Sequence, residues 1–512
     1  MKKETAKIPG GLIAAFKFVP LIVFALLVIV CKLNLLIAAP IATFCAIGVY
    51  MLVQKTSFET AFEQGLTGSK KIAVVFFILM FAYATAECFM ATGVGAALIN
   101  LALELGVTAR TVALVSMLVT CLLSTATGTS WGTFAACAPI FLWLNHLVGG
   151  NVMLTVCCIA GGSCFGDNVG MISDVTVLSC GMQDVKIIDR LKHQLVWAVG
   201  CLVIASGIVL AASWSLPNTP ADVAAAFEQI TPEIREGLAA ERPAALTLLE
   251  QVEAGQPYYL IIPLVVVIVL SFLKFHTMIC LGAGMVSSLI VGMIAGTTNF
   301  ASWLGGLENL TQLGLDSNSG LLFDGFESAG SWVIVMMLWV SAFGGIMNSM
   351  NAFDPLAKLI VRISKNVHQL MGWCGVLCLA GNMALADEAA QVATISPIIR
   401  DTVEKNVECA DEKAAYSLRL RLATFTSAMG IYGSELVPWH CFPVFFAGIA
   451  STVYPLVDFT PIDIISQNYM SFIVVGSALL LTFTGLDRFI PGFRLPDSSR
   501  AKLRKEQPAK AK

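Results

Sequence analysis

The stretch SCFGDNVGMISDVTVLS, residues 163–179, places two aspartates, Asp167 and Asp174, inside a long apolar region. A carboxylate at the middle of a bilayer costs at least ~2.5–3.5 kcal/mol on membrane-insertion scales. Each aspartate therefore needs a partner, and because no lysine lies at a matching depth, a bound cation or proton is the simpler occupant. The alternative for each aspartate is an interfacial cap near a helix end. Gly166 and Gly170 let a helix unwind here and expose backbone carbonyls. The polar side chains beside that break are Asn168, Ser173 and Thr176.

The composition indicates a polytopic membrane protein. Of 512 residues, 57% are hydrophobic and 13% are charged, whereas a globular domain carries about 25% charged residues. The net charge of −3, with no long basic stripe, does not indicate a nucleic-acid partner. The 15 cysteines lie mostly in apolar runs, without metal-site or disulfide spacing. Apolar segments of spanning length occur near 12–31, 33–54, 71–101, 193–214, 257–275, 277–298, 331–350 and 468–487.

The distribution of basic residues predicts how the chain crosses the membrane. Residues 215–256 are acidic, and residues 299–330 contain no Lys or Arg. The positive-inside rule places these two segments outside and the basic clusters in the cytoplasm. We therefore expect a bacterial inner (plasma) membrane protein with both termini cytoplasmic, whose first span is an anchor rather than a cleaved signal peptide. The basic clusters include Lys2, Lys3 and Lys7, then Lys55, Lys70 and Lys71, then Lys186, Arg190 and Lys192, and the tail from Arg488 onward.

Tracing the path predicts an all-α polytopic membrane protein of two inverted repeats, each with five crossings, a re-entrant hairpin and an interrupted helix. The hairpins are expected at 111–148 and 367–399, and the interrupted crossings at 151–183 and 414–455. Four regions follow from this path. They are a first transmembrane repeat at 1–214, an acidic extracytoplasmic loop at 215–256, a second inverted transmembrane repeat at 257–490 and a basic cytoplasmic tail at 491–512.

The two halves align at the hairpin tips. Residues 126–140 match residues 384–398, with Pro139 over Pro397. This places Thr129 and Ser130 over Asp387 and Glu388. Hydroxyls and freed carbonyls at such a tip are ligands suited to Na⁺, although small residues at a tip also permit close helix packing. The interrupted crossings match less cleanly, with residues 165–174 against 432–441.

Three further titratable groups lie in apolar segments of the sequence. Glu435 and His440 flank Pro438-Trp439, where the proline breaks the second interrupted helix. His440 titrates near neutral pH and is a candidate proton relay, the alternative being a satisfied buried donor. Glu87, in the third span, is a second relay candidate or a packed and protonated acid.

The segments GTSWGTF (128–134) and GDNVGMISDVTVLS (166–179) closely resemble the NhaC family of Na⁺/H⁺ antiporters, in which GTSWGT precedes G-D-x-x-S-P-I-S-D-T-T-x-L-S. LVPWHCFPVFFAGI resembles the family's second-half P-W segment. The resemblance covers residues 71–200 and 330–490. It implies cation-coupled transport, with Asp167, Ser173, Asp174, Thr176, Thr129 and Ser130 near the cation or substrate site. Gly170-Met171 and Val175 depart from the family pattern, which leaves the substrate open.

We predict a secondary active transporter like the Na⁺/H⁺ antiporters, with Na⁺ or H⁺ as coupling ion, no other cofactor, and a tentative Na⁺ site at Asp167 and Asp174. It works by alternating access in membrane lipid and moves a small cation. A Na⁺- or H⁺-coupled carrier of an amino acid or small organic acid is the alternative, and a homodimer is left open. An ion channel is a remote alternative because no repeated filter loop occurs. An enzyme is not expected, since HExxH and GxSxG with a partnered His are absent.

Overall fold

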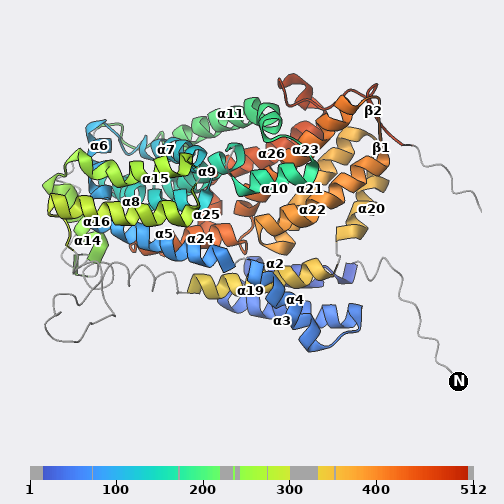
Figure 1. Ribbon diagram of the computed structural model, residues 1–512, viewed down its shortest axis with the longest axis horizontal. Helices are drawn as coiled ribbons and strands as arrows, with labels where there is room; N and C mark the ends of the chain where they lie inside the picture. Colours follow the sequence, from blue (N-terminus) through green and yellow to red (C-terminus); the bar gives the residue numbers. More distant parts are fainter. Residues whose placement is uncertain are drawn as a thin grey trace, which may run out of the picture.

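The computed structural model describes residues 15–71, 73–170, 173–219, 235–236, 243–273, 275–299, 332–350 and 353–504. Most of these residues are helical (Figure 1). The sheet found in this part of the chain is a single antiparallel pair, β1 (Val407–Cys409) with β2 (Ala501–Leu503). The predicted all-α polytopic class is thereby confirmed.

In the described part of the chain, five helices are long and apolar enough to cross a bilayer by themselves. Two further spans arise if each of two bent helix pairs, bent by 63° and 50°, is counted as one. The first bent pair joins α5 (Ala73–Ala91) to α6 (Val94–Glu104), and the second joins α23 (Glu412–Ile431) to α24 (Cys441–Val453). The five single helices are α3 (Leu35–Gln54), α8 (Ser130–Val148), α9 (Val152–Val169), α11 (Ile187–Ala212) and α16 (Thr277–Ala295).

The predicted third span, 71–101, is broken rather than continuous. α5 ends at Ala91, and Gly93 adopts a left-handed backbone with φ of 92° before α6 begins. Glycine tolerates this conformation because it has no Cβ. The shorter elements of the fold are α2 (Val19–Ala25), η1 (Leu26–Val30), α14 (Pro243–Ala254), η2 (Tyr258–Ile261), α15 (Ile262–Phe272), α20 (Phe353–Ile363), α25 (Pro461–Ser466), α26 (Tyr469–Thr484) and η5 (Leu486–Phe489).

A helix from each half of the chain packs against a helix of the other half. α2, α3, α4 (Phe58–Lys71) and α19 (Trp332–Ser349) form a layer along one edge of the molecule (Figure 1). In this layer α3 packs on α19, and elsewhere α16 packs on α5. Such reciprocal packing is compatible with an internal two-fold repeat. The inverted orientation of the repeats and the ten crossings stay predictions.

Two helical hairpins lie where the sequence predicts them. The first joins α7 (Val112–Thr127) to α8, and the second joins α21 (Val367–Leu385) to α22 (Glu388–Asn406). Each tip consists of one left-handed residue and one extended residue. The left-handed residues are Gly128 (φ 68°) and Ala386 (φ 54°), and the extended residues are Thr129 (φ −139°) and Asp387 (φ −147°). The two tips therefore share one backbone shape in the predicted register.

The two interrupted helices break between the hairpins. α9 ends at Val169, and α10 (Asp174–Gln183) begins after the N-cap Ser173. α23 is followed by the short turn η4 (Ser434–Leu436), and α24 begins after the N-cap His440. α8 packs on α24, and α22 packs on α10. Each hairpin thus lies against the broken helix of the other half, which brings the tips and the breaks together.

The predicted extracytoplasmic loop is described only in part. Residues 243–254 of it form α14, whose side chains Leu248 and Leu249 are buried. α14 packs on α5 and α6, so this part of the segment is an integral part of the helical body. Its side of the membrane stays a prediction.

Candidate ion site between the two hairpins

Asp167 ties the first broken helix to the first hairpin tip. Its side chain is 5% exposed, and its Oδ2 accepts hydrogen bonds from Ser130 Oγ at 2.6 Å and from the Ser130 backbone N–H at 3.2 Å. The N-cap of α8, Thr129, makes no side-chain cap bond. Asp167 therefore caps α8 from another helix, and its negative charge is stabilised at the positive end of the α8 dipole.

Gly166 serves close packing rather than the unwinding that the sequence led us to expect. α9 continues through Gly166 and ends three residues later. A Cβ at Gly166 would lie 1.8 Å from the Thr125 backbone nitrogen and 2.0 Å from the Ser124 carbonyl carbon. The α7 and α9 backbones are thus in direct contact, as small residues permit between membrane helices. This contact places Ser124 Oγ 3.1 Å from the Asp167 backbone N–H, which donates to it.

The end of α9 is occupied by a cation of the protein itself. Arg190 is 1% exposed and donates from Nη2 to the Asn168 backbone oxygen (3.2 Å) and to Asn168 Oδ1 (2.9 Å). Its Nη1 donates to Thr176 Oγ1 at 3.0 Å, and Gln194 Nε2 also donates to the Asn168 oxygen, at 2.9 Å. The expectation that Arg190 lies in a short basic loop is wrong, because α11 begins at Ile187 and this side chain is buried within the protein. Its side of the membrane stays a prediction. The search for a cationic partner of the two aspartates considered only lysines and therefore did not identify Arg190.

The polar residues after the break fix the start of α10. Ser173 Oγ accepts from the Thr176 backbone N–H at 3.2 Å, and Thr176 Oγ1 donates to the Asp167 backbone oxygen at 3.2 Å. These bonds join both sides of the break. The side chain of Asp174 lies outside the described residues. The Na⁺ site that combines Asp167 with Asp174 accordingly stays a prediction.

The second tip brings another carboxylate toward Asp167. Asp387 caps its own helix, with Oδ1 accepting from the Ala390 N–H at 2.6 Å. Glu388 is 8% exposed and lies beside Trp131 of the first hairpin, near enough to Asp167 for the two charges to interact. Among the described residues no donor reaches Glu388 Oε2. Buried carboxylates from both halves of the chain are thus within electrostatic range of each other.

Glu435 lies in a separate, fully buried polar cluster. Ser471 Oγ donates to its Oε2, and Asn468 and Cys164 lie beside the carboxyl group. Cys164 is also close to Asp167, so the cluster adjoins the first break. Ser471, Asn468 and Cys164 are all neutral, and a buried ionised carboxylate normally needs a paired cation. A carboxyl group in such surroundings is suited to carry a proton.

His440 is the N-cap of α24, and Glu87 lies on α5, which packs on α24. The Nδ1 atom of His440 accepts from the Phe442 N–H at 3.3 Å, which requires this nitrogen to be unprotonated. A relay through His440 would therefore have to break the cap of α24. Glu87 is 3% exposed on α5, one turn from Tyr83, whose ring contacts Phe445 of α24. Both relay roles stay predictions.

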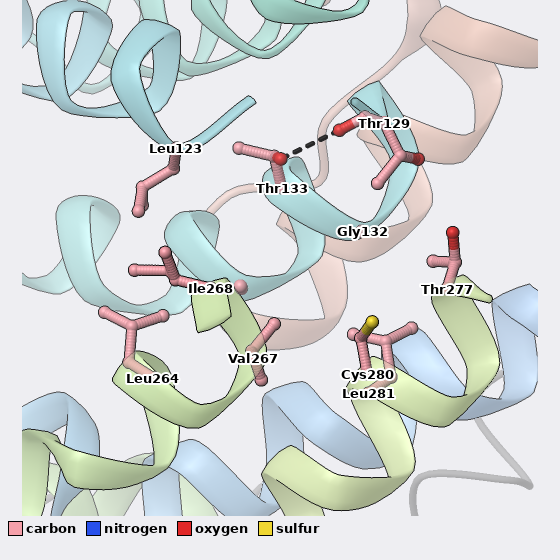
Figure 2. A pocket seen from close by; sticks show the side chains of 11 residues that line it. Leu123, Thr129, Gly132, Thr133, Leu264, Val267, Ile268, Thr277, Cys280 and Leu281 are labelled. Carbon is pink, nitrogen blue, oxygen red and sulfur yellow. Dashed lines mark hydrogen bonds between the residues drawn. The ribbon is translucent and has the colours of Figure 1, made fainter. Parts of the chain in front are cut away.

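Thr129 lines a small cavity between the first hairpin and helices α15 and α16. Figure 2 shows its side chain on the same side as Thr277, with the Thr133 hydroxyl donating to the Thr129 backbone oxygen at 2.8 Å. The remaining wall is mostly aliphatic, with Leu264 and Ile268 from α15. The two neighbouring tip residues therefore have different surroundings, since Ser130 binds Asp167.

Hairpins and broken helices whose buried carboxylates meet between the tips are typical of secondary active transporters. The comparisons with known proteins agree, and the chain belongs to the Na⁺/H⁺ antiporter family, whose model matches residues 7–214 and 162–486. The protein is therefore a multi-pass membrane protein and a secondary active antiporter. The matched family and relatives are transporters and not enzymes, in line with the sequence prediction.

Three relatives cover most of the chain at low identity. The Na⁺/H⁺ antiporter NhaC of Alkalihalophilus pseudofirmus is 22% identical over 419 residues, which are 81% of this chain and 83% of the relative. The malate-2H⁺/Na⁺-lactate antiporter of Bacillus subtilis is 21% identical over 375 residues, 73% of each chain. The arginine/ornithine antiporter ArcD of Halobacterium salinarum is 23% identical over 346 residues, 66% of this chain and 65% of the relative.

Proposed function

We propose that the protein exchanges Na⁺ for protons at a site formed by Asp167, Ser130 and Glu388. The observation that carries this proposal is the pair of buried carboxylates, Asp167 and Glu388, which lie near each other on opposite halves of the chain. Two such charges in a low-dielectric interior repel each other unless a positive charge compensates them. The Arg190 guanidinium is near enough to Asp167 to offset part of this negative charge, and Na⁺ or a proton supplies the rest. The two ions therefore compete, and competition at one site yields exchange.

The Asp167–Ser130 contact couples ion binding to the hairpin. In the described state the carboxylate caps α8 through the Ser130 hydroxyl and N–H. A cation or proton that binds this carboxylate weakens both charge-assisted hydrogen bonds. Ion binding thereby changes the free energy of holding the tip against the break, as alternating access requires. Glu435, with its neutral neighbours, is assigned to a second proton.

Transport by reconstituted protein tests the proposal. Purified protein in liposomes that contain a pH-sensitive dye is given an inward Na⁺ gradient, and proton movement is followed with and without Li⁺ or K⁺ in place of Na⁺. Asp167→Asn should abolish the Na⁺-dependent signal, while Lys70→Gln, a change at an exposed surface position, should leave it unchanged. Wild-type rates in the Asp167→Asn variant would remove Asp167 from the ion site.

A second candidate function is exchange of a carboxylate-bearing solute, such as an amino acid or small organic acid. The observation in its favour is a set of buried polar groups without partners in the described chain, at the same break. The atoms without a hydrogen-bond partner are both amide atoms of Gln391, the Nδ2 of Asn168 and the Nε of Arg190. Two relatives are named for organic substrates, malate with lactate and arginine with ornithine. In the same liposomes, proton movement that needs one of these solutes besides Na⁺ would favour this function.

We further propose that residues 1–214 and 257–490 form the two inverted repeats in a bacterial inner membrane, with both termini in the cytoplasm. The reciprocal packing of α3 on α19 and of α16 on α5 supports this arrangement. Labelling of single introduced cysteines with an impermeant reagent in intact cells tests it. Labelling at residue 229 together with protection at residue 506 is expected, and the reverse pattern would overturn the orientation.

A further inference from the structure

A large basic cavity lies just beyond the end of α26. Its volume is about 620 Å³, and it is bounded by the start of α23 and by the chain that follows η5. Four basic side chains line it, and none of the described lining residues is acidic. These basic residues are Lys413, Arg488, Arg494 and Arg500. Such a concentration of positive charge around one hollow attracts an anion.

Three of the four charges are available to a ligand. Arg500 is held by Asp411, with its Nη2 at 3.0 and 2.8 Å from the two carboxylate oxygens. The Ala414 backbone N–H and this guanidinium hold the pKa of the exposed Asp411 carboxyl below its usual value. Within the described part of the chain, Lys413, Arg488 and Arg494 form no ion pair. An incoming anion would therefore meet the unpaired charges of Arg488 and Arg494, together with Lys413, whose charge Asp411 offsets in part.

The wall of the cavity is held in place from behind. Asp487 pairs with the buried Arg421 at 3.0 Å and accepts from the Leu495 backbone N–H at 2.9 Å. The Phe493 ring stacks on Trp197 with centroids 4.7 Å apart, and the Arg421 guanidinium lies 3.9 Å from the same ring. These contacts fix the chain between η5 and Leu495 against α11 and α23. A ligand then meets a preformed site and does not have to order the segment.

The position of the cavity identifies the kind of anion. The preceding helix α26 is apolar and ends at Thr484, with Leu480 60% exposed on its surface. Leu486 and Phe489, at the cavity itself or next to it, are 41% and 69% exposed. Exposed apolar side chains beside a basic hollow at the end of an apolar helix match the boundary between acyl chains and headgroups. A soluble anion would make no contact with these exposed apolar side chains, whereas the acyl chains of a lipid would.

We propose that this cavity binds the phosphate group of an anionic phospholipid, such as phosphatidylglycerol, from the adjoining membrane leaflet. Arg488 and Arg494 contact the phosphate with Lys413 opposite them, and the acyl chains lie along Leu486 and α26. Phosphate is shared with soluble anions, so the experiment has to separate the lipid from inorganic phosphate. This site does not depend on which ions or solutes the protein exchanges.

Native mass spectrometry of the full chain in detergent tests the proposal. Wild-type protein, Lys413→Gln/Arg488→Gln/Arg494→Gln and the control Lys55→Gln/Lys70→Gln/Lys358→Gln are titrated with phosphatidylglycerol, phosphatidylcholine and inorganic phosphate. All three control positions are exposed and lie outside the cavity. Wild type should bind phosphatidylglycerol at least about tenfold more tightly than phosphatidylcholine.

Removing the three cavity charges should weaken phosphatidylglycerol binding roughly fivefold per charge, or about a hundredfold in total, while the control stays within about twofold of wild type. Equal losses in both triple variants would show a general effect of surface charge and overturn the site. Displacement of the lipid by millimolar inorganic phosphate would overturn the lipid assignment in favour of a soluble anion. Equal melting temperatures of all three proteins in phosphatidylcholine micelles exclude misfolding as the cause of a loss.

Discussion

Replacing the two partners of the Asp167–Ser130 contact, singly and together, separates the structural role of Asp167 from its charge. Ser130→Ala removes the hydroxyl that donates at 2.6 Å but leaves the carboxylate. Asp167→Asn keeps a carbonyl oxygen that accepts from Ser130 and removes the negative charge. Both side chains are at most 5% exposed, so water cannot replace the lost bond. Ser130→Ala/Asp167→Asn completes a double-mutant cycle.

The size of the expected coupling follows from the chemistry of the bond. A hydrogen bond to a charged group is worth about 1.5–3 kcal/mol, against about 0.5–1.5 kcal/mol between neutral groups. Neutral side-chain pairs between membrane helices average about 0.6 kcal/mol in such cycles. The Asp167–Ser130 bond is short, buried and charge-assisted. We therefore expect a coupling energy of about 1.5 kcal/mol.

Two measurements on the same four proteins provide the test. Reversible unfolding by dodecyl sulfate in mixed micelles gives the free energies for the cycle, and Na⁺-driven proton movement in liposomes gives activity. Ser130→Ala should keep transport within about tenfold of wild type, since the loss of one charge-assisted bond is worth roughly that factor. Asp167→Asn should lose transport entirely although its loss of stability is similar.

Two results would contradict this reasoning. A coupling energy below about 0.3 kcal/mol would show that the negative charge of Asp167 adds nothing to its bond with Ser130 in the membrane. Full transport by Asp167→Asn, whatever the coupling energy, would show that the charge of Asp167 is not needed. The two results are independent because the first concerns the contact and the second concerns the ion.

Three further predictions use the same preparations. Gly166→Ala should lower the free energy of unfolding by about 3 kcal/mol or more, because its Cβ would clash with the α7 backbone, whereas Gly181→Ala, with open space around it, should change stability by less than about 0.5 kcal/mol. Arg190→Gln should cost about 3 kcal/mol because buried acceptors lose a charged donor, and Arg190→Lys should recover part of this loss and of the transport rate. In the wild type, proton competition should raise the apparent KM for Na⁺ by up to about tenfold for each unit that the pH falls. Glu388→Gln should abolish this rise. An unchanged pH profile would remove Glu388 from the site.

The local architecture was largely predictable because it depends on residues that are neighbours in the chain. The tips at Gly128-Thr129 and Ala386-Asp387 and the breaks before Ser173 and His440 appear in the predicted register. Left-handed turns, caps and prolines have local signatures in sequence. The partners of the candidate site residues have no such signature, since Ser130 and Asp167 are 37 residues apart. The packing of α9 against both helices of the first hairpin, α7 and α8, brings that pair together.

Arg190 shows most clearly why the site itself was harder to predict than the fold. In the sequence it belongs to a cluster of three basic residues that resembles a cytoplasmic loop. The other two, Lys186 and Lys192, are exposed as expected. What distinguishes it is its position on the inward face of α11, where Gln194, one turn later, donates to the same Asn168 oxygen. A Lys or Arg near a helix start is ordinarily assigned to the interface. Helical spacing of Arg190 with Gln194 was the available signal, because two polar groups four residues apart share a face.

The position of Arg190 also limits where an exchanged cation can bind. The carbonyl end of α9 is the electronegative end of that helix and would attract Na⁺, yet the guanidinium and Gln194 already donate to the Asn168 oxygen there. Asp167 lies one residue earlier and directs its carboxylate to the N-terminus of α8 instead. Arg190 thus supplies a permanent positive charge at the end of α9, whereas the exchanged cation binds at the carboxylates. Structural stabilisation and ion exchange are therefore carried by different groups. Loss of Arg190 should therefore open a second, non-productive cation position at the α9 end, so that Arg190→Gln binds Na⁺ without exchanging it for protons. Calorimetric Na⁺ binding that disappears together with transport in this variant would refute that division of roles.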